Sequence, residues 1–181
     1  MYEINNRVNT GFRNDPRYAR ALESLTKMLE KEADVDVYAI HEAGHLAYFL
    51  RMGIPESEII FRGPTILHKL EIGEFVYFPC ELRVHKKYLN DVDLESLAKA
   101  AAAGGVYERE LKGTRYLGDT VDREVFHSRY SVRSIAPAKD ESEMWEWAQN
   151  EVRLDLTHES NRTEAYKNAK RIREKCFRVC G

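Results

Sequence analysis

The sequence predicts an α+β fold, a mostly helical single domain with a small β-sheet inserted after its second helix. Apolar residues recur at the spacing of one helix face over most of the 181 residues. The segment 57–87 instead contains short runs of β-forming residues separated by glycine and proline. No internal repeat is present. These three observations favour one domain at residues 16–181, preceded by an irregular polar N-terminal arm at residues 1–15.

Two helices are expected to open the domain. The first covers residues 16–33, with its apolar residues on one face and with Asp15 as the N-cap before a proline at the first helical position. The second begins at an N-cap provided by Asp34 or Asp36 and ends at about Met52. Both helices therefore lie before the β-forming segment.

The remaining elements follow in the order strands, then helices. The segment 57–87 predicts a small sheet of about three strands. Asp93 is suited to cap the next helix, and glycines at Gly53 and Gly113 are suited to end the helices before them. The helices expected after the sheet cover residues 93–111, 120–131, 140–156 and 160–176.

Composition argues against several classes of protein. Lys and Arg number 28 and Asp and Glu number 30, and this net charge of −2 argues against a nucleic-acid binder. No run approaches the roughly eighteen apolar residues of a membrane span, and the N-terminus lacks the apolar core of a signal peptide. Three cysteines make an odd count, which favours reduced thiols and a cytoplasmic protein. Cys176 and Cys180, four residues apart, are interpreted as ordinary thiols rather than as a metal-binding pair.

The second predicted helix contains His-Glu-Ala-Gly-His at residues 41–45. Residues four apart lie on one face of a helix, so His41 and His45 can reach one metal ion. A catalytic zinc takes three protein ligands and leaves a position for water, so a third ligand must come from elsewhere. Glu42 lies beside the metal, where it can take the proton of a zinc-activated water and deliver it to the leaving amine. The motif thus predicts a zinc site with Glu42 as general base.

The surroundings of the motif favour a metal. The helix is apolar on nearly all sides, which predicts that it is buried. Two histidines and a glutamate on a buried helix need a partner that offsets their desolvation, and a metal ion is such a partner. The alternative is an accidental motif, with two core histidines satisfied by hydrogen bonds. The other histidines are expected to be surface or core residues rather than ligands: His68, His85, His127 and His158.

Four segments resemble, in the same order, the protease domain of the FtsH-family ATP-dependent zinc metalloproteases. YAIHEAGHLAYFL at 38–50 resembles the active-site helix of that family, and the segment at 56–63 resembles the strand that follows it. LAKAAAAGGVYERELKG at 97–113 resembles the family's helix with a glycine pair, and GDTVD at 118–122 resembles its Gly-Ala-Ser-Asn-Asp sequence. The resemblance covers about residues 35–131, and the order of the segments strengthens the weaker matches.

The resemblance implies that Asp122 is the third zinc ligand, because the last Asp of the family's sequence has that role. The residue pattern alone favours another role, since Asp122 falls in the first turn of a predicted helix, where a carboxylate stabilises the helix. Glu108, Glu110 and, more weakly, Asp119 are the alternatives for the third ligand. The assignment of Asp122 therefore depends on the resemblance.

The chain also departs from the family. Val106 and Tyr107 stand where the family has Arg and Ala, and residues 119–121 replace Ala-Ser-Asn. No AAA+ ATPase domain, Walker motif or transmembrane helix is found in the sequence. The part of the family's machinery that unfolds substrates and feeds them to the protease is therefore not expected here.

We expect a stand-alone zinc metallopeptidase in which His41, His45 and Asp122 hold zinc and Glu42 is the general base. Its substrate would be a peptide or an unfolded protein, bound in extended form along the strand near residues 59–61. The alternative function is a zinc-containing, proteolytically inactive interaction module derived from a peptidase domain. A homo-oligomer and a separate ATPase partner both remain open.

Overall fold

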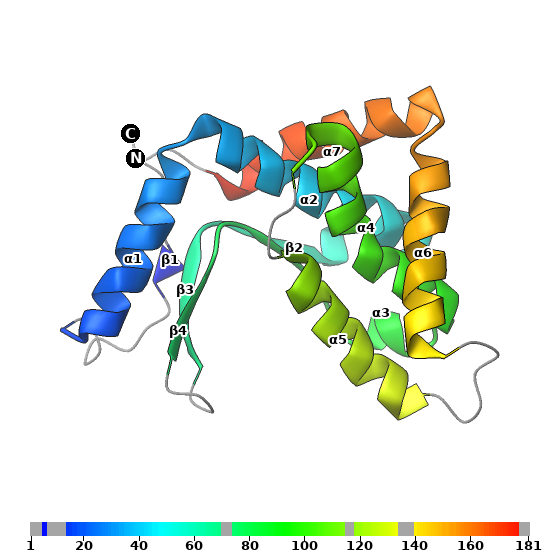
Figure 1. The fold of residues 1–181 in the computed structure, drawn as a ribbon, viewed down its shortest axis with the longest axis horizontal. Coiled ribbons are helices and arrows are strands. Elements are labelled where there is room, and N and C mark those ends of the chain that lie inside the picture. Colours follow the sequence, from blue (N-terminus) through cyan, green and yellow to red (C-terminus); the bar gives the residue numbers. More distant parts are fainter. Residues whose placement is uncertain (1–4, 7–13, 70–73, 115–117, 134–139, 178–181) are drawn as a thin grey trace.

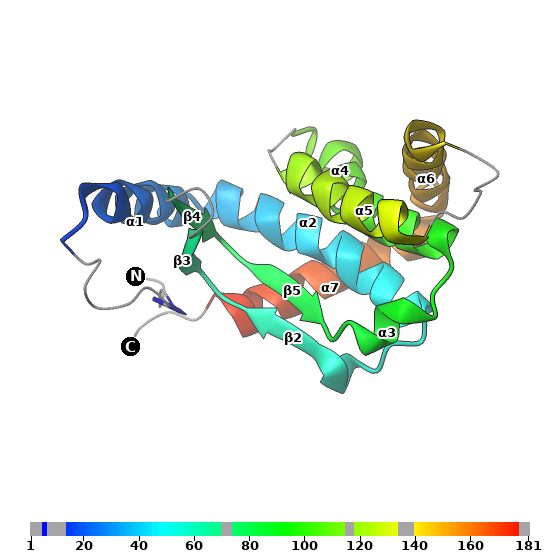
Figure 2. The ribbon, with the colours of Figure 1, turned by 90° about the horizontal axis from the view of Figure 1, so that it is seen from below.

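Helix α2 (Glu32–Arg51), which carries the HExxH motif, runs through the middle of the molecule (Figures 1 and 2). The computed structural model describes residues 5–6, 14–69, 74–114, 118–133 and 140–177. The other elements are, in chain order, β1 (Asn5–Asn6), α1 (Pro16–Leu29), β2 (Ile59–Arg62), β3 (Thr65–Lys69), β4 (Glu74–Phe78), β5 (Glu81–Val84), α3 (Lys87–Asn90), α4 (Leu94–Lys112), α5 (Gly118–Arg133), α6 (Glu141–Asp155) and α7 (Glu159–Cys176). A one-turn 3-10 helix at Glu56–Glu58 precedes β2. The architecture is mostly helical with a small β region, which confirms the predicted α+β class.

Two groups of elements cover α2. Figure 2 shows α4 and α5 along one side of α2, and β2, β5 and α7 along the other. The apolar residues around the motif are buried in this arrangement, as the sequence predicts, since α2 packs most extensively against α4 and α7. A helix enclosed in this way must be apolar on several faces. Its polar residues at the motif are therefore exceptions that need an explanation.

A smaller apolar cluster fixes α5, the helix that carries Asp122. Phe126 and Tyr130 of α5 pack against Met144 and Trp145 of α6, and the Phe126 and Trp145 ring centroids lie 5.8 Å apart. Alanines of α4 complete the cluster. The four-residue spacing of Phe126 and Tyr130 places them on one face of α5, so burial of this face sets the rotation of the helix.

The helix ends agree with the sequence in most places. The Asp15 carboxylate accepts a hydrogen bond from the Arg17 N–H, and Asp93 caps α4 in the same way. Gly53 and Gly113, which follow α2 and α4, have φ angles of 77° and 67°, a left-handed conformation that favours glycine. The predicted helices at 120–131, 140–156 and 160–176 correspond to α5, α6 and α7.

The predicted N-cap of α2 is wrong. The helix begins at Glu32, with Lys31 at the N-cap and no side-chain capping hydrogen bond, so Asp34 and Asp36 lie inside the helix. Glu32 and Asp34 occupy the first turn, where their negative charge stabilises the positive end of the helix dipole without a cap. Asp36 pairs instead with Arg173 of α7. The acidic residues therefore do indicate the start of the helix, but they lie inside its first turns and not at the N-cap.

The prediction of a single three-stranded sheet is also wrong. β2 pairs antiparallel with β5, while β3 pairs antiparallel with β4, so the segment forms two separate ribbons. Pro64 lies between β2 and β3 and has no N–H to donate, which favours a break in the pairing at this point. Asn5 and Asn6, which belong to the predicted irregular arm, form β1 and pair in parallel with β3. The rest of the arm before residue 14 lies outside the described residues, and the short helix α3 was not predicted.

The two helices of the resembling segments touch at a glycine. A Cβ atom built on Gly44 would lie 2.5 Å from the Ala103 carbonyl oxygen of α4, closer than any real contact of this kind. The absence of a side chain at residue 44 therefore lets α2 and α4 approach closely. Within the described part of the chain, no helix combines the length and apolar character that a bilayer span requires.

Gly44→Ala is expected to lower the free energy of unfolding by about 1–3 kcal/mol, because the new methyl group forces α2 and α4 apart. The sign of this change in the free energy of unfolding is informative, because a glycine-to-alanine change inside an unconstrained helix raises stability by up to about 1 kcal/mol. Urea denaturation of the two proteins measures the difference. A stabilised variant would contradict the close helix contact.

Candidate metal centre

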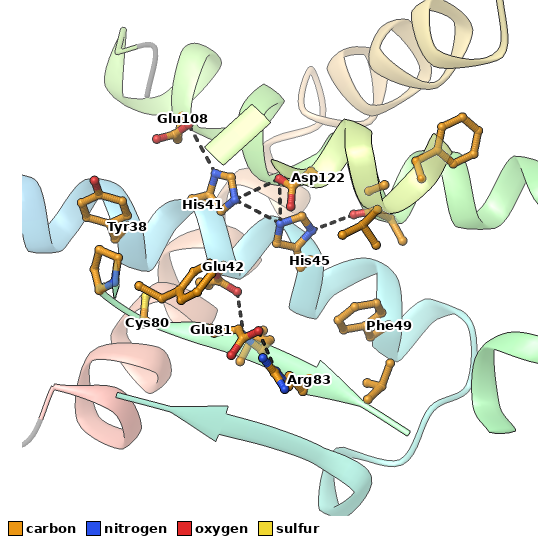
Figure 3. A pocket seen from close by; sticks show the side chains of 18 of the residues that line it. Tyr38, His41, Glu42, His45, Phe49, Cys80, Glu81, Arg83, Glu108 and Asp122 are labelled. Atoms are coloured by element: carbon orange, nitrogen blue, oxygen red, sulfur yellow. Dashed lines mark hydrogen bonds and ion pairs between the residues drawn. The ribbon is translucent and has the colours of Figure 1, made fainter. Parts of the chain in front are cut away.

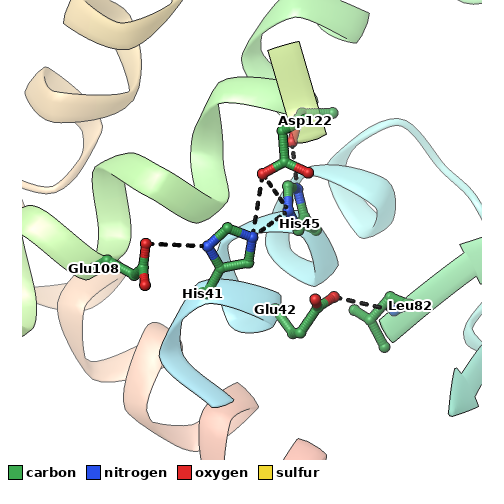
Figure 4. A network of polar contacts seen from close by, with 7 residues as sticks. His41, Glu42, His45, Leu82, Glu108 and Asp122 are labelled. Atoms are coloured by element: carbon green, nitrogen blue, oxygen red, sulfur yellow. Dashed lines mark hydrogen bonds and ion pairs between the residues drawn. The ribbon is translucent and has the colours of Figure 1, made fainter. Parts of the chain in front are cut away.

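The structure brings His41, His45 and Asp122 together at one point. His41 and His45 lie one turn apart on α2, and Asp122 reaches them from the first turns of α5 (Figure 4). The two Nε2 atoms are 3.1 Å apart, and Asp122 Oδ2 lies 3.1 Å from Nε2 of His41 and 3.2 Å from Nε2 of His45. Both imidazoles are buried, and the Asp122 side chain is 19% exposed. Three potential ligand atoms thus form a nearly equilateral triangle.

The second nitrogen of each imidazole determines which atom carries the proton. His45 Nδ1 lies 2.8 Å from the Ala100 carbonyl oxygen, which can only accept a hydrogen bond, so Nδ1 is the donor. His41 Nδ1 lies 3.3 Å from Oε2 of Glu108, and a carboxylate oxygen can likewise accept a hydrogen bond. In the neutral rings both Nε2 atoms therefore present lone pairs to each other and to a carboxylate. Such an arrangement is repulsive unless a cation lies between the three atoms.

The triangle fits a metal ion in size and chemistry. Ligand atoms bound tetrahedrally at about 2.0–2.1 Å from a metal are roughly 3.3 Å apart, close to the separations observed. Asp122 Oδ2 is shielded from solvent, and while both imidazoles are neutral it meets no hydrogen-bond donor among the described residues. A buried carboxylate oxygen without a donor is costly, and a cation would satisfy it. Of the described residues, His41, His45 and Asp122 form a group that can hold a metal ion.

Burial and charge oppose each other at the site. Burial by itself lowers the pKa of both imidazoles, but the Asp122 carboxylate outweighs it and raises the pKa of His45 and, together with Glu108, raises that of His41 well above its usual range. Burial raises the pKa of Asp122, but the two imidazoles outweigh it and lower that pKa below its usual range. The site therefore attracts positive charge, which protons supply when no metal ion does.

Gly104 of α4 makes room for the two rings. A Cβ atom built on Gly104 would lie 2.6 Å from Nε2 of His41 and 2.6 Å from Nε2 of His45. Any larger residue would push the imidazoles away from their common point. Gly104, the first glycine of the pair in the predicted 93–111 helix, therefore has a steric role at the candidate metal centre.

The alternatives for the third ligand lie elsewhere. Glu108 is buried and lies beside Nδ1 of His41, on the ring edge that faces away from Asp122. Glu110 is exposed and pairs with Arg153 of α6 at 3.0 Å. The side chain of Asp119 lies outside the described residues. The described carboxylate that meets both Nε2 atoms is that of Asp122.

Glu42 lies next to the triangle but points toward β5. Its Oε2 accepts a hydrogen bond of 3.0 Å from the Leu82 N–H (Figure 4). Burial raises the pKa of Glu42, a shift that suits a group that must accept a proton near neutral pH. The carboxylate is thus beside the three ligand atoms rather than among them, as the motif predicts.

A pocket of about 570 Å³ opens beside these residues (Figure 3). Its walls come from α2, the end of β4, β5, α3, α4 and the first half of α5. The expectation that the strand near residues 59–61 borders the site is wrong. β5 borders it, and β2 pairs with the opposite edge of β5, away from the pocket. The two strands are similar in length and character, so the sequence did not distinguish them.

Other residues of the chain lie apart from the centre. His127 and His158 are exposed, and His68 stacks on Phe75 in the β3–β4 ribbon. His85 is exposed and accepts a hydrogen bond from the Lys87 N–H. Cys176 is buried at the end of α7, and Cys180 lies outside the described residues. None of these four histidines belongs to the group that can hold a metal ion.

Sequence reasoning missed two contributors to the site, the Ala100 carbonyl and the orienting position of Glu108. No sequence signal identifies a main-chain carbonyl as an acceptor. A charged residue directly after the uncharged apolar run from Ala100 to Tyr107 is a signal for Glu108, because an isolated buried carboxylate needs a partner.

Glu108→Ala is expected to weaken metal binding by about 10- to 100-fold, because the Nδ1–H of His41 loses its acceptor and the ring loses its orientation. Glu108→Gln retains an acceptor oxygen and serves as the matched control, with a smaller loss. Competition titration of zinc against a chromophoric chelator measures both affinities. Equal affinity of Glu108→Ala and the wild type would contradict the orienting role.

Comparisons of the chain with protein-family models, curated proteins and solved structures found no match. The site is therefore interpreted from its own geometry, and the resemblance to the FtsH family stays a prediction.

Proposed function

We propose that this protein is a zinc-dependent metallopeptidase, a divergent relative of the FtsH-family protease domain. The observation that carries the proposal is the convergence of two imidazole lone pairs and a carboxylate oxygen, with Glu42 beside them at the wall of a pocket. Two imidazoles and one carboxylate are a donor set used by catalytic zinc. The buried free thiol of Cys80 is compatible with a reducing compartment such as the cytoplasm.

His41, His45 and Asp122 would hold zinc, and Glu108 and the Ala100 carbonyl would orient the two rings. Zinc, when bound, supplies Lewis acidity that favours ionisation of water and polarises a carbonyl. Glu42 takes a proton from the attacking water as the water oxygen forms a bond to the scissile carbonyl carbon. Glu42 then delivers that proton to the amine nitrogen as the C–N bond breaks, so water is consumed and a carboxylate and an amine are formed.

The pocket supports a peptide as substrate. Beside the polar residues of the site, α2 and α5 line it with Tyr38, Phe49, Val125 and Phe126, and β5 presents a strand edge along the other wall. An extended peptide can add to such an edge through main-chain hydrogen bonds and place side chains in an adjacent pocket. We therefore place the substrate along β5.

An inactive interaction module remains the second candidate. It is favoured by the hydrogen bond that ties the Glu42 carboxylate to the Leu82 N–H, since this bond engages the proposed base with the main chain. The presence of Glu42 at the pocket wall favours the peptidase, because a purely structural metal site has no need for a base there.

Hydrolysis of an unfolded protein by the zinc-loaded chain tests the proposal. Reduced, carboxymethylated casein is incubated with the zinc-loaded protein, with the same protein after chelation, and with the chelated protein after zinc is restored. The peptidase should produce new amino termini in the first and third samples and none in the second. Stoichiometric zinc with no cleavage in any sample would favour the interaction module.

A further inference from the structure

The hydrogen bond between Glu42 and Leu82 joins the proposed base to the strand that borders the pocket. Glu42 Oε2 lies 3.0 Å from the Leu82 main-chain nitrogen. Figures 3 and 4 show the Glu42 carboxylate directed at β5, while the imidazoles and Asp122 lie on its other side. In this state Oε2 of Glu42 is bonded to the main chain of the strand.

The pairing of β5 determines which main-chain groups face the pocket. In the β2–β5 ribbon Phe61 is opposite Leu82, and Ile60 is opposite Arg83. Because the Leu82 N–H donates to Glu42, the Phe61–Leu82 pair is the kind of antiparallel pair that exchanges no hydrogen bonds. Because main-chain groups alternate along an antiparallel strand, the N–H and C=O groups of Arg83 then point toward β2. The N–H and C=O groups of Leu82 and Val84 point toward the pocket.

A peptide that pairs with this edge needs the Leu82 N–H. The donors and acceptors at residues 82 and 84 are the ones that a substrate strand would use, and a single N–H cannot serve a carboxylate and a peptide carbonyl equally well. In the absence of a peptide, Glu42 satisfies a strand-edge donor that would otherwise be partly buried without a partner.

We propose that the Leu82 N–H is a latch for Glu42. It holds the carboxylate on β5 when no peptide is bound and releases it when the carbonyl of an extended peptide takes its place. The released carboxylate is then available to the water at the neighbouring site. This inference rests on the proposed peptidase function, and it adds a specificity rule: a substrate activates the base only if its backbone pairs with β5. Short substrates that cannot pair are poor substrates for this reason.

Hydrogen exchange tests the latch without any catalytic measurement. In the zinc-loaded wild type the Leu82 amide should exchange at least about tenfold more slowly than in Glu42→Ala, since a bond to a charged acceptor is lost. Glu42→Ala also leaves a bound peptide uncleaved. Adding a blocked hexapeptide of alternating alanine and leucine to this variant should restore the slow exchange at Leu82, and a blocked dipeptide should not.

Replacement of the Leu82 amide by an ester, through incorporation of the α-hydroxy analogue of leucine, tests the consequence for catalysis. The ester should raise kcat/KM for a blocked dipeptide amide and lower it for the hexapeptide, whereas the same replacement at Val84 should affect only the hexapeptide. Equal losses for both substrates with the ester at residue 82 would overturn the latch and make the N–H a positioning group. Unchanged Leu82 exchange in Glu42→Ala would overturn it as well. Failure of the zinc-loaded wild type to cleave either substrate would instead overturn the proposed function, and the exchange data remain a separate result.

Discussion

Glu42→Gln is expected to lower the rate of peptide hydrolysis by about 10²–10⁴-fold, the usual contribution of a general base, while zinc stays bound. The amide has nearly the same shape as the carboxylate and can still accept the Leu82 hydrogen bond, but it does not take up a proton at neutral pH. Zinc content measured by atomic emission and initial rates of casein cleavage give the two quantities on the same sample.

Glu110→Gln is the matched control, because Glu110 is exposed on the neighbouring helix and pairs with Arg153 on the surface. It should retain both zinc and activity. Wild-type rates in Glu42→Gln would assign the proton transfer to another group and contradict the mechanism proposed here.

Asp122→Ala is expected to reduce zinc affinity by more than about 100-fold, because the loss of a direct ligand exceeds the typical cost of losing an orienting partner. It leaves two imidazole nitrogens that converge with no carboxylate to complete the site. A metal whose free concentration is 100-fold above its dissociation constant adds about 2.7 kcal/mol to the free energy of unfolding. The variant should therefore also lose the stabilisation that zinc gives the wild type. For a chain of this size that corresponds to a melting temperature lower by roughly 5–11 °C.

Titration of zinc into both proteins, followed by thermal unfolding with and without a chelator, measures these effects. Chelation should lower the melting temperature of the wild type and leave that of Asp122→Ala nearly unchanged. Glu110→Ala removes another carboxylate that the sequence offers as a ligand and should behave like the wild type. Wild-type zinc affinity in Asp122→Ala would show that a different residue completes the site.

The parts of the site that sequence reasoning predicted are the local ones. His41 and His45 lie one turn apart because the helical repeat places residues at this spacing on one face, whatever the rest of the fold. The cap at Asp15 and the glycines after α2 and α4 depend on the same short-range geometry, and these predictions are confirmed. The position of Asp122 depends on how α5 packs against α4 and α6, and the resemblance, rather than the residue pattern, pointed to it.

The parts that sequence reasoning missed depend on competition between distant segments. β2 was expected beside the site, but β5 occupies that place, and the choice between them is made by strand pairing and by the packing of α7 against β2. Glu108 and Glu110 lie on different faces of α4. The way α4 packs turns the Glu108 carboxylate toward His41 and the Glu110 carboxylate toward α6. Such differences arise from tertiary packing and leave little trace in local sequence.

Anomalous diffraction at the zinc absorption edge, from crystals of the zinc-loaded protein, tests the central claim most directly. We predict a single strong peak among Nε2 of His41, Nε2 of His45 and Oδ2 of Asp122, at about 2.0–2.2 Å from each atom. No peak at this position, with the two imidazoles turned toward separate hydrogen-bond partners, would contradict the account of the site and the function built on it.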